Sequence, residues 1–195
     1  MLDAGARRPG TMAAVLGLDG GVVSALCAEV SDGEGVVVAA NLNAPDQTVI
    51  SGDPDAVARA GERLKAAGAK RVLPLKVSGA FHSPLMEPAR EGLAAALQEV
   101  PFANPRAPVV ANASAEPVRD ADMARRLLSE QLTAPVRWVE SMRCAAALAP
   151  EATFLEIGPG TVLAGLVKRT TPGVTATSLG TADECEAYLS QQGGT

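Results

Sequence analysis

The stretch GVVVAANLNAPDQTVISGDPDAVARAGERLKAAGAKRVLPLKVS, residues 35–78, decides the fold of this chain. Its first part holds two β-branched, apolar runs that meet at a Pro-Asp turn, and these predict two neighbouring strands. The run 53–68 has apolar residues at helical spacing and predicts a helix that Asp53 can cap and Gly68 ends. The run 69–78 predicts a strand whose proline places it at a sheet edge or at a bulge.

The residues before this stretch complete a unit of six elements. TMAAVLGL (11–18) predicts a strand, and DGGVVSALCAEV (19–30) predicts a helix that Asp19 can cap. The order is therefore strand–helix–strand–strand–helix–strand, which is the split βαβ or ferredoxin-like pattern. We expect residues 12–77 to form a compact small subdomain.

The remainder of the chain, residues 78–195, alternates predicted helices with predicted strands. The expected helices are 83–100, 120–132, 135–148, 161–170 and 181–192, and the expected strands are 107–114, 152–160 and 173–180. This alternation predicts an α/β fold with a parallel sheet and helices on both faces. The small subdomain is then an insertion whose ends lead into a larger α/β body.

Composition excludes several classes of function. The 195 residues are 47% hydrophobic and carry a net charge of −5, which suits a globular chain with a mildly acidic surface. No basic block is present and aromatic residues make up only 3%, so we expect no nucleic-acid partner. No run of about 18 apolar residues is present, so we expect no membrane span.

The three cysteines, Cys27, Cys144 and Cys185, are widely separated, and the chain has a single histidine. This set matches no zinc motif, so we expect no metal site. Reduced, buried thiols in a cytoplasmic protein are the expected interpretation. The N-terminal residues lack the apolar segment of a signal peptide, which agrees with a cytoplasmic location.

SGAFHSPLM (78–86) contains that single histidine, His82, between a predicted strand and a predicted helix. Histidine can act as a general base near neutral pH, and loops between elements often carry such residues. A surface or core position is the plainer alternative. A base also needs a nucleophile, yet the chain has no G-x-S-x-G elbow, and the neighbouring Ser83 is expected to cap the next helix.

Two glycine- or asparagine-containing stretches have both a structural and a functional interpretation. EIGPGTVLAGL (156–166) is a glycine turn before a helix, which can be a tight strand–helix turn or an anion site. Asn41 and Asn43 stand beside a proline turn, where they can serve the turn itself or line a pocket.

Five stretches in this order resemble the malonyl-CoA:acyl carrier protein transacylase family of bacterial type II fatty acid synthesis. They are TMAAVLGL, ANLNAPDQTVISG, GAFHSPLM, QLTAPVRWVESMR and EIGPGTVLAGLVKR, and they extend from about Thr11 to about Leu179. The resemblance to the acyltransferase domains of polyketide synthases is more distant. The resemblance to the transacylase family implies a ferredoxin-like βαββαβ subdomain inserted into an α/β-hydrolase-like acyltransferase body, of which only the C-terminal part is present.

The resemblance also implies an activity and its residues. A serine takes malonyl from malonyl-CoA and passes it to the phosphopantetheine thiol of acyl carrier protein, without a cofactor. His82 matches the base that activates the serine, and the main-chain carbonyl of Gln131 matches the group that orients the ring. Phe81 matches the family position where an aromatic residue before the histidine goes with malonyl rather than methylmalonyl. With Asn41 and Asn43 in their functional interpretation, it makes up the expected substrate pocket.

The family's nucleophile elbow, oxyanion loop and carboxylate-binding arginine all precede its MAAVLGL strand, and here only eleven residues precede Met12. Arg7 and Arg8 stand too close to that strand to be this arginine. We therefore expect no nucleophile in this chain and no activity by itself. We also expect a chain that is prone to aggregate, because strands without their partners expose edges and apolar faces. A misplaced start codon, a degenerate remnant and one half of a split enzyme are the alternatives that this leaves open. Two further alternatives concern the function. The chain can be a non-catalytic fragment that binds acyl carrier protein or CoA, or a fragment of a polyketide synthase acyltransferase.

Overall fold

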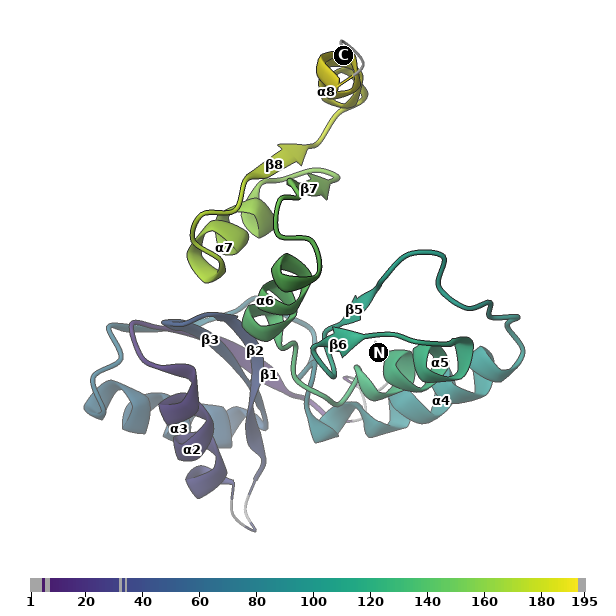
Figure 1. The fold of residues 1–195 in the computed structure, drawn as a ribbon. Helices are drawn as coiled ribbons and strands as arrows, with labels where there is room; N and C mark the ends of the chain where they lie inside the picture. Colours follow the sequence, from purple (N-terminus) through teal and green to yellow (C-terminus); the bar gives the residue numbers. More distant parts are fainter. Residues whose placement is uncertain (1–4, 6–7, 32, 34, 193–195) are drawn as a thin grey trace. The chain divides into compact units, whose positions relative to one another are not determined.

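The computed structural model describes residues 5, 8–31, 33 and 35–192 (Figure 1). By its internal contacts the chain divides into two compact units, Met1–Ser141 and Met142–Thr195. The predicted division into subdomains 12–77 and 78–195 rests on fold elements rather than on contact density, and it stays a prediction.

The first unit is built on a four-stranded antiparallel sheet with strand order β2-β3-β1-β4. The strands are β1 (Thr11–Leu16), β2 (Val37–Ala44), β3 (Gln47–Gly52) and β4 (Arg71–Pro74). This order and the two intervening helices, α2 (Gly20–Val30) and α3 (Pro54–Ala66), confirm the ferredoxin-like pattern. The proline-containing strand β4 lies at the edge of the sheet, as its composition predicts.

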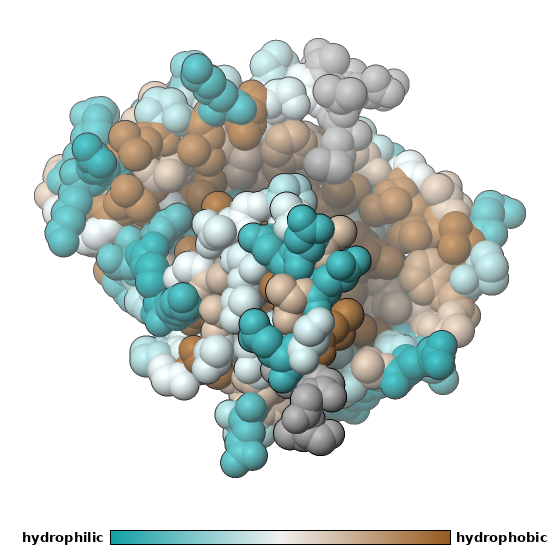
Figure 2. Space-filling model, turned by 90° about the horizontal axis from the view of Figure 1, so that it is seen from above, coloured by the Kyte–Doolittle hydropathy of each residue, from teal (hydrophilic) through white to brown (hydrophobic). Residues whose placement is uncertain are grey.

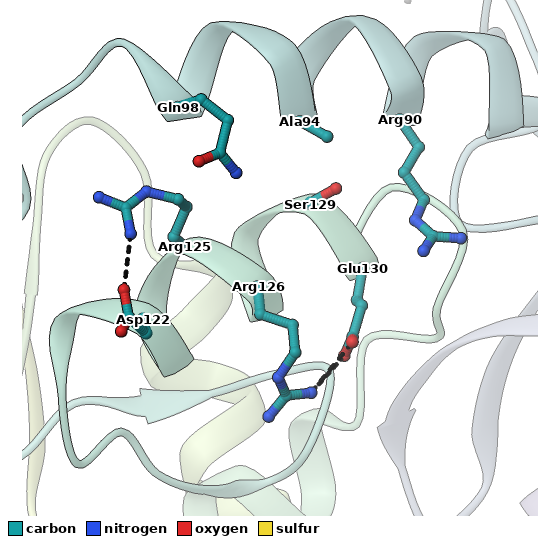
Figure 3. Close-up of a pocket in the computed structure, with 8 residues that line it drawn as sticks. All are labelled: Arg90, Ala94, Gln98, Asp122, Arg125, Arg126, Ser129 and Glu130. Carbon is teal, nitrogen blue, oxygen red and sulfur yellow. Dashed lines mark hydrogen bonds and ion pairs between the residues drawn. The ribbon is translucent and has the colours of Figure 1, made fainter.

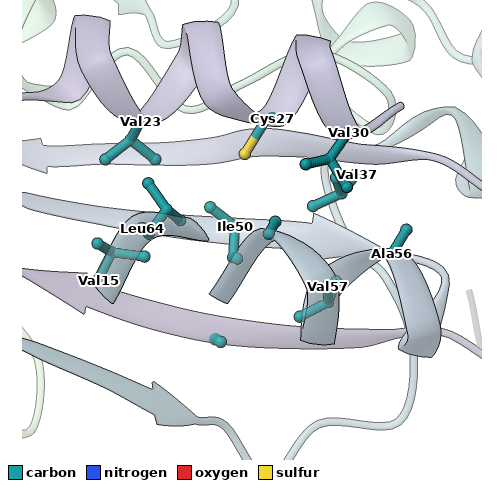
Figure 4. Packing of buried hydrophobic residues seen from close by; sticks show 11 residues of the cluster. Val15, Val23, Cys27, Val30, Val37, Ile50, Ala56, Val57 and Leu64 are labelled. Carbon is teal, nitrogen blue, oxygen red and sulfur yellow. The ribbon is translucent and has the colours of Figure 1, made fainter. Parts of the chain in front are cut away.

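Both helices pack on one face of this sheet, where they form the main core (Figure 4). Val15, Val23, Ile50 and Leu64 are completely buried there. Cys27 lies in the same cluster, and burial raises the pKa of its thiol to about 12. Its interpretation as an inert, buried residue is therefore confirmed.

The ends of the two helices match the predicted signals with one exception. Asp19 accepts hydrogen bonds from the N–H groups of Gly21 and Val22, so its role as cap of α2 is confirmed. Gly68 has a φ of +102°, a conformation that suits glycine after the end of α3. The expected side-chain cap by Asp53 is wrong, because its carboxylate makes no hydrogen bond with the first turn of α3.

The second half of this unit departs from the expected parallel sheet. The expected strand 107–114 is reduced to β5 (Val110–Ala111), which pairs antiparallel with β6 (Glu116–Pro117). The cause is a tight turn in which Ala115, at a φ of +57°, donates its N–H to the carbonyl of Ala111. The chain thus folds back before a longer strand can form.

After the sheet, the described residues of the first unit form three helical segments and the start of a fourth. They are η1 (Pro84–Met86), α4 (Glu87–Gln98), α5 (Ala121–Glu130) and α6 (Trp138–Leu148), of which α6 continues past the division between the units. Helices α4 and α5 pack against each other. Asp120 caps α5 by accepting a hydrogen bond from the N–H of Met123.

The second unit contains β7 (Phe154–Ile157), α7 (Val162–Thr170), β8 (Ala176–Leu179) and α8 (Ala182–Gln192). Strands β7 and β8 pair in parallel, so the expected parallel pairing is confirmed here. Apolar side chains of this unit nevertheless reach the surface, with Ile157 74% and Val162 71% exposed. Figure 2 shows apolar residues on the surface of one face of the molecule.

Candidate functional site

The His82 loop connects β4 to η1 and holds its histidine in an unusual backbone conformation. His82 has a φ of +57°, in the left-handed region that non-glycine residues seldom adopt. The next residue, Ser83, is completely buried. Its hydroxyl donates to the carbonyl of Ala80 at 2.7 Å and accepts from the N–H of Leu85. Its role as a helix cap is therefore confirmed, and its hydroxyl is engaged on both sides.

The ring of His82 contacts the main chain of Gln131, at the C-terminal end of α5. Nδ1 of His82 lies 2.9 Å from the carbonyl oxygen of Gln131. A carbonyl oxygen only accepts, so Nδ1 must carry the proton that it donates. In the neutral ring, Nε2 is then left with a free lone pair, which is the state a general base requires. The structure brings these two residues together, while their roles in catalysis stay predictions.

The loop after Gln131 is attached to the sheet. Val136 forms a parallel bridge with Asn41 on the outer edge of β2. The N–H of Val136 donates to the carbonyl of Ala40 at 2.8 Å, and its carbonyl accepts from the N–H of Leu42 at 2.9 Å. The carbonyl that holds His82 is thus only five residues from a contact with the small subdomain's sheet.

The face of the sheet opposite α2 and α3, which we call the second face, carries Met12, Ala40 and Val49. Phe81 packs against this cluster, immediately before the histidine. Asn41 stands opposite Val49 in the register, which places it on the same face. The sequence predicts both residues in the substrate pocket, and the fold brings both to this face.

Asn43 has a different environment. The pairing of β2 with β3 is irregular between Ala39 and Asn41 and again between Leu42 and Ala44, so Asn43 lies in the second bulge. Bulges redirect side chains and are frequent beside functional sites. The structure therefore supports a local backbone role for Asn43, and its place in a pocket stays a prediction.

The glycine turn after β7 is a tight strand–helix turn whose helix amides are already occupied. Glu156 accepts hydrogen bonds from the N–H groups of Leu163 and Ala164 at 3.0 and 2.8 Å, and from the hydroxyl of Ser178. The backbone hydrogen bonds from Ala164 and Leu163 hold the pKa of Glu156 below its usual value. Because this internal carboxylate takes the place of an external anion at the helix N-terminus, the structure favours the turn over the anion site.

Arg8 is held by a partner far along the sequence. Its Nε and Nη2 donate to the two carboxylate oxygens of Asp53 at 3.0 and 2.7 Å. Partial desolvation raises the pKa of Asp53, but hydrogen bonds from the N–H of Val36 and from Arg8 bring it below its usual value. Arg8 therefore has a structural ion pair, which agrees with the expectation that it is not the substrate-binding arginine. Arg7 lies outside the described residues.

A cavity of about 370 Å³ lies between α4 and α5, and none of the predicted site residues lines it. Figure 3 shows the residues that do. The arginines of this cavity are not free to bind an anion, because each is paired with a carboxylate. The pairs are Arg90–Glu87, Arg125–Asp122 and Arg126–Glu130. A second, mostly apolar cavity of about 330 Å³ is lined by β5 and α5 and is bordered by Gln131.

The described residues offer neither a metal-binding cluster nor a membrane-spanning helix. Among the described residues, no group of three or more histidine, cysteine or carboxylate side chains is placed to hold a metal ion. No helix in the described part of the chain is long and apolar enough to cross a membrane.

The chain is similar to known acyltransferases over nearly its whole length. The family described as acyl transferase domain matches residues 3–187. The malonyl CoA-acyl carrier protein transacylase of Salmonella typhimurium is 43% identical over 182 residues, which are 93% of this chain and 58% of that protein.

Solved structures agree with this similarity. An acyl carrier protein S-malonyltransferase from Vibrio cholerae has a TM-score of 0.87 and 39% identity, over 92% of this chain and 58% of that chain. A malonyl-transacylase solved in complex with a type II PKS acyl-carrier protein has a TM-score of 0.89 and 38% identity, over 96% of this chain and 61% of that chain.

The chain thus spans about three-fifths of the length of these relatives. The matched portion contains the small subdomain, the His82 loop and the segment from Gln131 to Trp138. These matches confirm the resemblance predicted from the sequence, and they show that this chain belongs to the acyl transferase domain family.

Proposed function

We propose that this chain carries the base-bearing part of a malonyl-CoA:acyl carrier protein transacylase. The observation that supports this most directly is the 2.9 Å contact between Nδ1 of His82 and the carbonyl of Gln131, which leaves Nε2 as a free base. The relatives' names supply the substrate and the partner that we infer, malonyl-CoA and acyl carrier protein. Fatty acid synthesis is the setting that we propose.

In the proposed reaction, Nε2 of His82 accepts the proton of a serine hydroxyl while the serine oxygen attacks the thioester carbonyl of malonyl-CoA. The protonated ring then gives that proton to the departing CoA sulfur, and a malonyl ester of serine remains. In the second half, Nε2 takes the proton of the phosphopantetheine thiol as its sulfur attacks the ester. The ring finally returns the proton to the serine oxygen, and no cofactor is required.

The serine in this scheme comes from outside the present sequence, which contains no G-x-S-x-G elbow. We propose that it lies in the part of the acyltransferase fold that the relatives have and that this chain does not span. The three free cysteines agree with a reducing, cytoplasmic setting for the reaction.

A polyketide pathway is the second candidate. It is favoured by the relative solved with a type II PKS acyl-carrier protein, whose identity to this chain is close to that of the Vibrio cholerae enzyme. The chemistry at His82 is the same in both, so the two candidates differ in the carrier protein. Transfer rates to a fatty acid carrier and to a polyketide carrier would separate them.

The experiment has two arms. The chain alone, incubated with labelled malonyl-CoA, is expected to form no covalent adduct detectable by mass spectrometry. The chain combined with the N-terminal segment of the Salmonella relative is expected to transfer malonyl, and His82→Ala should reduce the rate by roughly 10²–10⁴-fold.

The control for the second arm is Lys65→Ala near the end of α3, where the side chain is half-exposed and pairs only with Glu62 on the same helix. A malonyl adduct on a serine of the isolated chain would contradict the proposed absence of a nucleophile. Equal rates of malonyl transfer by the complemented enzyme and by its His82→Ala variant would contradict the role of His82 as the base.

A further inference from the structure

The side chain of Gln131 closes the loop that carries the carbonyl bound to His82. Its Nε2 amide group donates to the carbonyl of Ala134 at 3.0 Å and to the carbonyl of Pro135 at 3.3 Å. The same residue therefore orients the histidine through its main chain and braces its own loop through its side chain.

The loop needs such a donor because of its composition. Pro135 has no N–H, so the backbone cannot close the turn at that position. The amides of Thr133 and Ala134 are already used, since both donate to the carbonyl of Glu130. The two amide protons of Gln131 thus satisfy two carbonyl groups that the turn leaves without a backbone donor.

Both ends of the loop are fixed independently of this amide. At the start, the N–H of Gln131 donates to the carbonyl of Leu127 in the last turn of α5. At the end, Val136 bridges β2. Between these ends, the N–H of Leu132, which shares a peptide group with the Gln131 carbonyl, donates to the carbonyl of Ser129 at 3.4 Å. The bonds from the Gln131 amide to the carbonyls of Ala134 and Pro135 brace the rest of this segment.

We propose that the side-chain amide of Gln131 is a positioning group that holds His82 in its Nδ1–H tautomer. Without the amide, the loop relaxes, the carbonyl turns away from Nδ1, and the ring distributes its proton over both nitrogens. The functional meaning rests on the proposed role of His82 as the base. The effect on the ring is a property of this chain and needs neither substrate nor serine.

The test uses the fact that His82 is the only histidine, so its ring signals need no assignment. The ¹⁵N shifts of Nδ1 and Nε2 are measured in the unmodified chain and in Gln131→Met, at a pH where the ring is neutral. Methionine has a similar length but donates no hydrogen bond. The matched control is Gln98→Met, at an exposed position on α4.

We expect two well-separated ring shifts, typical of a single Nδ1–H tautomer, in the unmodified chain and in Gln98→Met. In Gln131→Met the two shifts should move toward each other. Unchanged ring shifts in Gln131→Met would overturn the inference, because a side chain that merely stabilises the turn would not alter the tautomer.

A second measurement needs no variant. In the unmodified chain, the Nε2 protons of Gln131 should exchange with solvent roughly two- to tenfold more slowly than those of the exposed Gln98, the factor expected for one hydrogen bond. Equal exchange rates would also overturn the inference. A complemented enzyme that fails to transfer malonyl, although His82 keeps its Nδ1–H tautomer, would contradict the proposed function alone.

Discussion

Two neighbouring valines on α2 provide a direct test of how the small subdomain is packed. Val23 is completely buried in the core between the helices and the sheet, whereas Val22 is 42% exposed. A valine-to-alanine substitution removes two methyl groups. At Val23 these groups come from the core, and at Val22 they come largely from the surface.

The expected free energies of unfolding differ clearly. Removing two buried methyl groups costs about 1.6 kcal/mol, at ~0.8 kcal/mol for each. A residual cavity of some tens of Å³ costs about 1 kcal/mol more. Alanine returns about 0.5 kcal/mol because it is the better helix former. We therefore expect Val23→Ala to lower the free energy of unfolding by about 2 kcal/mol and Val22→Ala to change it by less than about 0.5 kcal/mol.

The assay is equilibrium unfolding in urea, followed by far-ultraviolet circular dichroism for the unmodified chain and both variants. Val23→Ala should lower the urea midpoint at an unchanged slope, because only stability changes. Equal midpoints for the two variants would refute the reasoning, since they would mean that α2 does not bury the face that carries Val23.

Three further predictions follow from the site and its surroundings. In a complemented enzyme, Phe81→Ser should raise the use of methylmalonyl relative to malonyl by roughly 10–200-fold in kcat/KM, because the space of one methyl group is opened beside His82, the proposed base. An unchanged ratio with both rates lowered would show that Phe81 serves packing alone. The pKa of Asp53 lies below its ordinary 3.8 in the folded chain, so its carboxylate stabilises the fold above the unfolded-state pKa, and this contribution is lost as the pH falls through the folded pKa. Asp53→Asn should therefore flatten the acid side of the stability–pH profile measured by urea titration, and a profile parallel to that of the unmodified chain would contradict this. Finally, a fluorescent apolar dye should bind the native chain, and Ile157→Glu should reduce the emission, because Ile157 is 74% exposed; a chain that binds no dye would count against an accessible apolar surface.

Several local features of this protein are predictable from short stretches of sequence. The cap at Asp19, the end of α3 at Gly68 and the edge position of β4 depend on residues within a few positions of one another. Backbone preference and short-range hydrogen bonding decide such features, so the sequence is sufficient to predict them.

Features that depend on a competing contact are predicted less well from the local pattern. Asp53 has the sequence context of a helix cap, yet its carboxylate binds Arg8, 45 residues away, and the N–H of Val36. The apolar run around Val110 has the composition of a long strand, but the turn at Ala115 limits it to two paired residues. In both cases a competing contact, which the local pattern does not contain, determines the result.

The site shows the same distinction. By itself the sequence determined that one histidine stands in a loop between a strand and a helix, and its motifs indicated the family and the matching positions Phe81 and Gln131. Only the tertiary structure decided that His82 and Gln131 meet, that Val136 attaches this loop to β2, and that the amide of Gln131 braces it. The physical reason is that a hydrogen bond needs a distance of about 3 Å and a suitable direction, and across 49 residues of sequence only the folded path of the chain sets both.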